Sequence, residues 1–217
     1  WEDYFPNAEY IIDIVNPNPK IGELINFIEK LASIKYNSIV GIGGGSVIDT
    51  AKVLSVISDP SEKIIRKYLD GTFNCSSAPH DLIAIPTTSG TGSEVTPFAT
   101  VWDDKNKKKL SLQSPSIYPK YAIIDACLAL SLDIKMTAIS GLDALSHCFE
   151  SLWNKNANPL SKSTAFVAID IILETLDDLL DNLDNIKLRR NMAWASLLGG
   201  YCINQTKTAL AHSISYP

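Results

Sequence analysis

The hydrophobic pattern of the sequence changes abruptly at about residue 130. Before this point, short apolar runs alternate with amphipathic segments, which is typical of strand–helix units over a parallel sheet. After it, the alternation stops and three long helical patterns follow, at residues 135–153, 159–183 and 188–204. The sequence therefore predicts an α/β domain with a parallel, Rossmann-like sheet at residues 1–130, followed by an all-α domain at residues 131–217.

Individual elements of the first half follow from the same periodicity. In one amphipathic segment, Ile21, Leu24 and Ile28 recur at helical spacing, so that they can cover one face of a sheet. Short apolar runs bounded by turn residues predict strands. The predicted helices are residues 21–33 and 46–58, and the predicted strands are residues 10–15, 38–42, 82–85 and 122–125.

The charge balance excludes several classes of partner. The chain has 19 basic and 24 acidic residues and a net charge of −5, which argues against binding to nucleic acid or to an anionic membrane surface. No segment approaches the roughly 20 consecutive apolar residues of a membrane-spanning helix. The four cysteines lie far apart without a CxxC pair, which favours free thiols in a reducing compartment. We therefore expect a cytoplasmic protein.

A glycine-rich turn, Gly43 to Gly45, connects a predicted strand to a predicted helix and is followed by Ser46. Glycines let the backbone approach a ligand closely, and the free N–H groups at a helix start favour a phosphate. The pyrophosphate of a dinucleotide would fit there. The motif is not GxGxxG, and a tight structural turn would need the same glycines, so both interpretations stay open at this point.

A second loop, rich in hydroxyl groups, runs from Pro86 to Glu94 and also follows a predicted strand. The carboxyl ends of strands in an open α/β sheet line the ligand crevice. We therefore expect this loop and the glycine turn to face the same ligand, although a solvated turn of small residues would have a similar composition.

Asp143 and His147 lie four residues apart on a predicted helix, so their side chains share one face. A carboxylate and an imidazole suit Fe²⁺ or Zn²⁺. His212, in the apolar stretch 209–214, is a third candidate ligand. Two ligands alone make a weak site, because pairs at this spacing are also common as surface hydrogen bonds.

These motifs, taken in order, resemble the iron-containing (group III) alcohol dehydrogenases, which are related to glycerol dehydrogenase and dehydroquinate synthase. The resemblance covers nearly the whole chain. It rests on the Pro17–Pro19 turn, GGGSVIDTAK from Gly43, PTTSGTGSEVT from Pro86, the lysine before Leu110, the strand ending in Asp125, GLDALSH from Gly141, and His212.

The resemblance implies a role for each matching residue. Gly44, Gly45 and Ser46 would hold the pyrophosphate of NAD or NADP, and Asp49 would support that turn. Thr87, Thr88 and Thr91 would line the cofactor, and Lys109 would reach its ribose. Asp143, His147 and His212 would bind Fe²⁺, with Zn²⁺ as the alternative.

The same comparison predicts that the chain is a fragment. The first strand–helix units, the residue that selects NAD or NADP, and a fourth metal-binding histidine would lie outside it. Tyr216 stands where many relatives have a histidine thought to relay the hydroxyl proton, so a relay role for Tyr216 is a hypothesis. For the full-length protein we expect a homodimer or a larger homo-oligomer.

The implied reaction is hydride transfer between nicotinamide and a metal-polarised aldehyde or alcohol. The segments EVTPFATVWD, SLWNKNANP and KTALAHSISYP are most similar to phosphonoacetaldehyde reductases, which implies reduction of phosphonoacetaldehyde to 2-hydroxyethylphosphonate. Two alternatives remain open: a metal-dependent lyase of the dehydroquinate synthase type, and a non-catalytic nucleotide-binding fragment.

Overall fold

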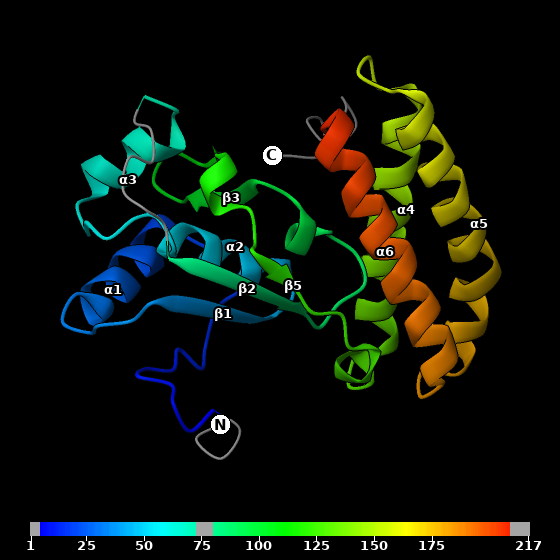
Figure 1. The fold of residues 1–217 in the computed structure, drawn as a ribbon, viewed down its shortest axis with the longest axis horizontal. Coiled ribbons are helices and arrows are strands. Elements are labelled where there is room, and N and C mark those ends of the chain that lie inside the picture. The colour runs from blue at the N-terminus through cyan, green and yellow to red at the C-terminus, as the bar shows by residue number, and fades with distance from the viewer. Residues whose placement is uncertain (1–4, 73–79, 209–217) are drawn as a thin grey trace.

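The computed structural model describes residues 5–72 and 80–208. It places a sheet-containing part beside three long helices, α4, α5 and α6 (Figure 1). The predicted order, an α/β part with a parallel sheet followed by an all-α part, is confirmed. The exact division at residue 130 stays a prediction.

The parallel sheet has the strand order β1-β2-β5, with β1 at Ser38–Gly43, β2 at Asp81–Pro86 and β5 at Tyr121–Ala122. β1 and β2 pair in register from their first residues to their last, where Gly43 lies opposite Pro86. The loops that follow these two strands therefore leave the sheet at the same edge. This register is what brings the glycine turn next to the hydroxyl-rich loop.

Helices and a hairpin pack beside the sheet. Helix α1 (Ile21–Leu31), α2 (Gly45–Leu54) and α3 (Glu62–Leu69) contribute to one hydrophobic core together with the antiparallel hairpin β3–β4, Phe98–Asp103 and Lys108–Gln113. Alternate residues of β3 are buried, as expected for a strand with one face on a core. The buried members of this core include Leu24, Phe27, Val53, Ile65, Val101, Leu112 and Ile117.

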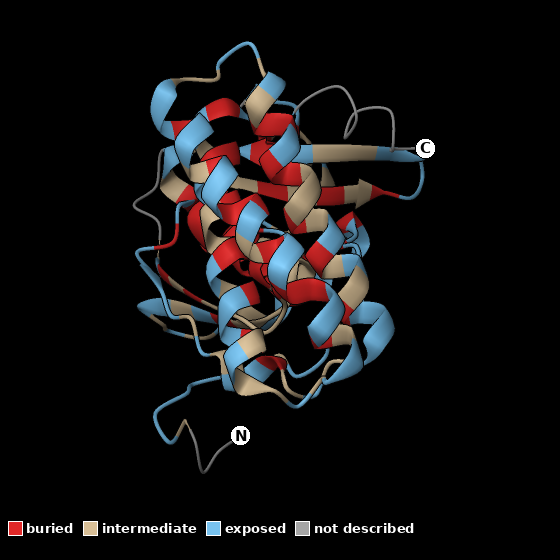
Figure 2. Cartoon of the chain, turned by 90° about the vertical axis from the view of Figure 1, so that its right-hand side faces the viewer, coloured by how far each residue is buried: buried red, intermediate tan, exposed pale blue. Residues whose placement is uncertain are grey.

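The second part consists of α4 (Ile134–Trp153), α5 (Pro159–Asp181) and α6 (Ile186–Thr206). Each helix begins at a side-chain cap: Asp133, Asn158 or Asn185 accepts a hydrogen bond from a backbone N–H of the first turn. These helices share a separate hydrophobic core, and α5 turns a largely exposed face away from the sheet (Figure 2). The buried members include Ala144, Cys148, Ala168, Ile172, Leu179, Met192 and Cys202.

Short 3₁₀ turns connect these elements: η1 at Ser93–Val95, η2 at Pro115–Ile117 and η3 at Ala126–Ala129. η1 contacts α6, and a hydrogen bond between Asn204 Nδ2 and the Tyr118 hydroxyl, 3.4 Å long, also joins the two parts. The helical bundle is therefore docked against the sheet-containing part at several points.

Several predicted elements differ from the structure. Residues 10–15 do not form a strand, because a strand needs a hydrogen-bonding neighbour and the described residues provide none there. The last strand is Tyr121–Ala122 rather than residues 122–125, and α2 begins at Gly45 and ends at Leu54 rather than running from 46 to 58. Helix α3 and the β3–β4 hairpin were not predicted from the sequence.

An open hollow of about 680 Å³ lies between residues 5–15 and β1. Its lining contains none of the predicted site residues. Among the described residues, no helix has the length and apolar character needed to cross a membrane, and the three described cysteines are free thiols.

Candidate functional site

The glycine turn and the hydroxyl-rich loop touch each other at the edge of the sheet. The Thr87 N–H donates to the Gly43 carbonyl over 3.0 Å. A Cβ on Gly44 would lie 3.3 Å from Thr88 Cγ2, and one on Gly45 would lie only 2.7 Å from Thr91 Cγ2. A side chain at Gly45 would clash with Thr91, and one at Gly44 would be tight against Thr88, so the glycines let the two loops approach.

Helix α2 begins within this turn, at Gly45. Gly44 is the residue before the helix, and its carbonyl accepts from the N–H groups of Val47 and Ile48. The first N–H groups of a helix have no partner within it, and together with the helix dipole they attract an anion. The chemistry of this corner fits the pyrophosphate of a dinucleotide.

The Pro17–Pro19 turn also reaches this corner. Its central residue, Asn18, has a φ of 61°, and its N–H donates to Ser46 Oγ over 3.1 Å. Asparagine adopts this left-handed conformation more readily than most residues. The two prolines contribute to the family resemblance, but the contact between Asn18 and Ser46 was not predicted from the sequence.

Asp49, one turn into α2, joins this helix to Ser93 and to Thr100 in β3. Its carboxylate accepts from the Ser93 hydroxyl over 2.6 Å and from the Thr100 N–H over 2.8 Å. Burial raises the pKa of Asp49, whereas Lys52, the two hydrogen bonds and Lys109 act in the opposite direction. These contacts join α2 to residues 93–100, and a role of Asp49 in supporting the glycine turn stays a prediction.

Lys109 lies in β4 and links the two groups of predicted site residues. Its strand partner is Trp102, and its Nζ lies 5.9 Å from the centre of that ring. Burial lowers the pKa of Lys109, while the negative charges of Asp49 and Asp143 raise it. Lys109 is thus close enough to both carboxylates to feel their charges, although one belongs to α2 and the other to α4.

The predicted metal ligands Asp143 and His147 lie side by side on α4. His147 Nε2 is 3.7 Å from Asp143 Oδ1, and the histidine side chain is 6% exposed. A carboxylate oxygen and an imidazole nitrogen this close together are donors of the kinds that bind Fe²⁺ or Zn²⁺. His212 and Tyr216 lie outside the described residues, within which no three potential ligands cluster.

Three buried polar residues near Asp49 and the hydroxyl-rich loop were not predicted as site residues: Lys52, Ser93 and Glu94. Ser93 and Glu94 were visible only as part of the hydroxyl-rich loop, and Lys52 as part of the glycine motif. The signal that could have identified Lys52 is its position three residues after Asp49, on the same face of one helix and within an apolar stretch.

Comparison with protein families gives two matches in sequence order. Residues 6–126 match the family model for iron-containing alcohol dehydrogenases. Residues 137–217 match the model for the C-terminal region of the Fe-containing alcohol dehydrogenase family.

Individual relatives cover most of the chain. Alcohol dehydrogenase 4 of Schizosaccharomyces pombe is 31% identical over 207 residues, which is 95% of this chain and 49% of the relative. The phosphonoacetaldehyde reductase of Streptomyces viridochromogenes is 33% identical over 193 residues, 87% of this chain and 49% of the relative. The chain thus spans about half the length of these relatives.

A solved structure shows the same arrangement of elements. The sulfoacetaldehyde reductase from Bifidobacterium kashiwanohense, determined in complex with NAD⁺, is 33% identical and superposes with a TM-score of 0.86. The match covers 93% of this chain and 54% of that one.

Proposed function

Because the chain belongs to the iron-containing alcohol dehydrogenase family, as the sequence resemblance implied, we propose that it carries the cofactor site and part of the metal site of a nicotinamide-linked alcohol dehydrogenase or aldehyde reductase. The proposed reaction interconverts an aldehyde and a primary alcohol. This family membership favours the dehydrogenase over a lyase of the dehydroquinate synthase type.

The observation that carries the proposal is the contact between the glycine turn and the hydroxyl-rich loop at the start of α2. The Thr87 N–H donates to the Gly43 carbonyl over 3.0 Å, and Thr91 packs against Gly45. Both loops therefore lie at the N-terminus of one helix, where backbone N–H groups favour a phosphate.

For the cofactor, we propose that the N–H groups of Gly44, Gly45 and Ser46 bind the pyrophosphate of NAD or NADP. The contacts of Gly44 with Thr88 and of Gly45 with Thr91 support a role for Thr87, Thr88 and Thr91 in lining the bound cofactor. Asp49 keeps the turn in place, and Lys109 is the proposed donor to the ribose.

For the metal, we propose that Asp143 and His147 are two ligands and that His212 is a third. A carboxylate with imidazoles accepts Fe²⁺ and also Zn²⁺. When bound, the metal supplies a Lewis acid for the substrate oxygen, and the nicotinamide supplies or accepts the hydride. The role of the protein is to align them: α4 carries two of the ligands, and the loops after β1 and β2 hold the cofactor.

For the substrate, we propose a short aldehyde that carries an anionic group, with phosphonoacetaldehyde as the first candidate and 2-hydroxyethylphosphonate as its product. The proposal rests on two relatives, a phosphonoacetaldehyde reductase and a sulfoacetaldehyde reductase, each 33% identical to this chain. Both of these substrates are two-carbon aldehydes that carry an anionic group, a phosphonate in one and a sulfonate in the other.

The test, made on the full-length protein, is oxidation of NADH and of NADPH after reconstitution with Fe²⁺ or Zn²⁺, with phosphonoacetaldehyde, sulfoacetaldehyde and acetaldehyde as substrates. We expect turnover to be fastest with one of the two anionic aldehydes. Turnover with acetaldehyde alone would retain the family and reject the substrate proposal. Absence of turnover, despite binding of both metal and NADH, would contradict the proposed enzymatic function.

Metal content separates a ligand role from a general loss of structure. We expect Asp143→Ala to lower both the bound metal, measured by elemental analysis, and the turnover. The matched control is Asp177→Ala, on the exposed face of α5, which should keep both. Full metal content in Asp143→Ala would remove Asp143 from the proposed ligand set.

A further inference from the structure

Lys52 is a fully buried lysine of α2 with a complete set of hydrogen-bond acceptors. Its Nζ donates to Ser93 Oγ over 2.8 Å, to Thr96 Oγ1 over 3.2 Å and to the Phe98 carbonyl over 2.6 Å. An ammonium group has three N–H donors, so these three contacts satisfy it. All three acceptors lie in the single segment 93–98.

The charges around Lys52 come from two elements. Asp49 Oδ1, on α2, lies 4.0 Å from its Nζ, and Glu94, in η1, adds a second negative charge. Ser93 completes the network by donating its hydroxyl proton to Asp49. Burial lowers the pKa of Lys52 to about 8, although both carboxylates act to raise it.

Segment 93–98 is held to the same helix at a second place. The Ser93 N–H donates to Thr91 Oγ1 over 3.3 Å, and Thr91 packs against Gly45 at the start of α2. The helix therefore contacts this stretch of chain twice: through Gly45 at the phosphate-binding turn, and through Asp49 and Lys52 one to two turns later.

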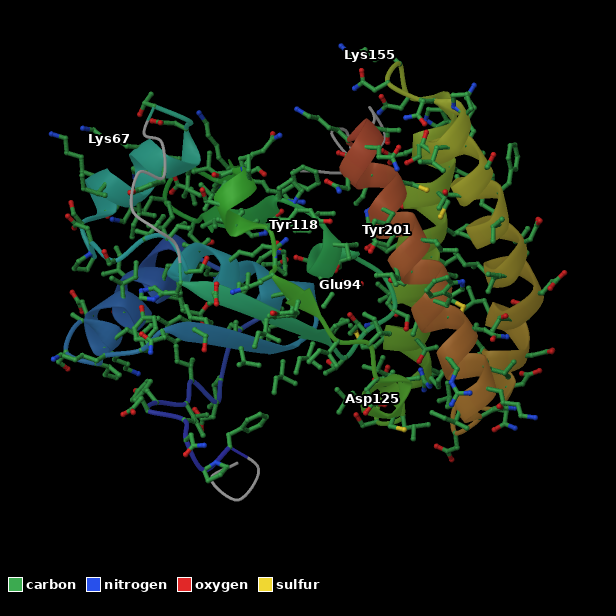
Figure 3. All side chains as sticks on the ribbon, viewed as in Figure 1. Lys67, Glu94, Tyr118, Asp125, Lys155 and Tyr201 are labelled. Atoms are coloured by element: carbon green, nitrogen blue, oxygen red, sulfur yellow. The ribbon has the colours of Figure 1, made fainter. Side chains whose placement is uncertain are left out.

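The segment also touches the helical part of the molecule. A Cβ on Gly92 would lie 2.4 Å from the Gly200 Cα of α6, so the two backbones are in direct contact. Glu94, labelled in Figure 3 beside α6, lines a small cavity together with Thr88 and Ser196. Lys52 is thus bonded to the stretch of chain that meets α6.

We propose that Lys52 is a positioning residue that fixes the phosphate-binding turn relative to the helical part, through the hydrogen bonds that it donates to residues 93–98. It does not touch the proposed cofactor position. Without its three donors, residues 93–98 would keep only the Ser93–Asp49 hydrogen bond to α2, and Thr91 would be held less firmly against Gly45. This inference rests on the proposed binding of a nicotinamide dinucleotide at that turn.

The first test is NADH binding, followed by fluorescence, in the wild type and in Lys52→Met. Methionine keeps the length of the side chain but removes the charge and the donors. Hydrogen bonds to charged groups are strong enough that we expect binding to weaken about tenfold or more. The control is Lys63→Met on the exposed face of α3, which should change the affinity less than about twofold.

The second test is the pH dependence of NADH affinity, which a merely space-filling role would leave unchanged. Above about pH 8, Lys52 loses its charge and one N–H donor, so the wild-type affinity should fall as the pH rises through this value. Lys52→Met should lack this fall. Lys109→Gln should retain it, which distinguishes Lys52 from the other lysine near the site.

Three results would overturn the inference. Two of them, a Lys52→Met protein with wild-type affinity or a wild-type affinity that stays constant through pH 8, would reject it and leave the proposed function intact. A wild-type protein that binds neither NADH nor NADPH would reject both. If Lys52→Met does not fold, as judged by circular dichroism, the wild-type and Lys109→Gln pH profiles still decide the matter.

Discussion

At the scale of single residues, the sequence predicted the backbone features of the site better than its side-chain network. Glycines after a strand and hydroxyl groups after the next strand identify two loops, because both motifs are local in sequence. The partners of Asp49 and Lys52 are not local: Ser93 is 41 residues from Lys52, and Thr100 is 51 residues from Asp49. Only the fold shows that these groups meet.

The Asp49 carboxylate provides a direct test of this network. In Asp49→Asn, the amide can accept from either the Ser93 hydroxyl or the Thr100 N–H, but its NH₂ group would face the other donor. A buried donor left without an acceptor costs about 1–3 kcal/mol. We therefore expect the free energy of unfolding, measured with urea, to fall by about that amount.

The matched control for this substitution is Asp170→Asn, at an exposed position of α5, where the expected change is within about 0.5 kcal/mol. NADH affinity should fall in Asp49→Asn and stay constant in the control, because Asp49 is proposed to support the phosphate-binding turn and Asp170 lies on α5, away from it. Equal stability of the wild type and Asp49→Asn would contradict the assigned hydrogen bonds.

At the scale of elements, the long helices were predicted most closely. Their periodic patterns extend over many turns, and α4 begins within one residue of the predicted start. The β3–β4 hairpin was missed because its connection contains neither Asn-Gly nor Asp-Gly. For residues 10–15 the prediction was wrong because an apolar run cannot show whether a neighbouring strand is available.

The missed α3 and the missed hairpin are joined by an ion-pair network. Arg66 of α3 binds the carboxylate of Asp103 in β3 with two nitrogens, and Glu62 accepts from the same guanidinium over 2.8 Å. Asn106 also donates to Asp103 over 2.7 Å. These partners, Arg66 first, hold the pKa of Asp103 well below its ordinary value.

This network predicts the acid sensitivity of the contact between α3 and the hairpin. Because the pKa of Asp103 is lower in the folded state, the network stabilises the fold above about pH 4, and this contribution is lost as the pH falls towards the folded-state value. Arg66→Met should therefore lower the free energy of unfolding at neutral pH, and the difference from wild type should shrink below about pH 4.

Urea unfolding of the wild type and Arg66→Met across this pH range measures the effect, with Lys63→Met on the same helix as the control. A difference between wild type and Arg66→Met that is constant with pH would show that Arg66 acts through packing and not through the charge of Asp103.

At the scale of the whole molecule, two hydrophobic cores are separated in sequence. One is built from residues between 21 and 117, and the other from residues between 144 and 202. The sequence indicated this division through the change of pattern near residue 130. It did not indicate how the two parts dock, because docking depends on glycines that have no periodic signature. Gly92 meets Gly200 of α6, and Gly90 packs against Ser140 of α4.

Gly200→Ala should therefore disturb the docking of the two parts more than either core. Its Cβ would lie 2.7 Å from Val95 Cγ2 and 2.9 Å from the Gly92 Cα, and the second neighbour is backbone that cannot rotate away. Overpacking of this kind costs about 1–3 kcal/mol. We expect a lower midpoint of thermal unfolding, and faster amide hydrogen exchange in residues 92–95 and in the facing turn of α6.

The control for a general glycine-to-alanine effect is Gly22→Ala in α1, where a Cβ would meet no atom within 4 Å. Alanine favours the helix by up to about 1 kcal/mol, so this variant should be slightly more stable than the wild type. The contact between Gly92 and Gly200 also places the hydroxyl-rich loop against α6. If this contact aligns the loop with α4, Gly200→Ala should bind NADH more weakly while Gly22→Ala binds it normally. An unchanged unfolding midpoint and unchanged exchange in Gly200→Ala would mean that the two parts do not rely on this backbone contact to dock.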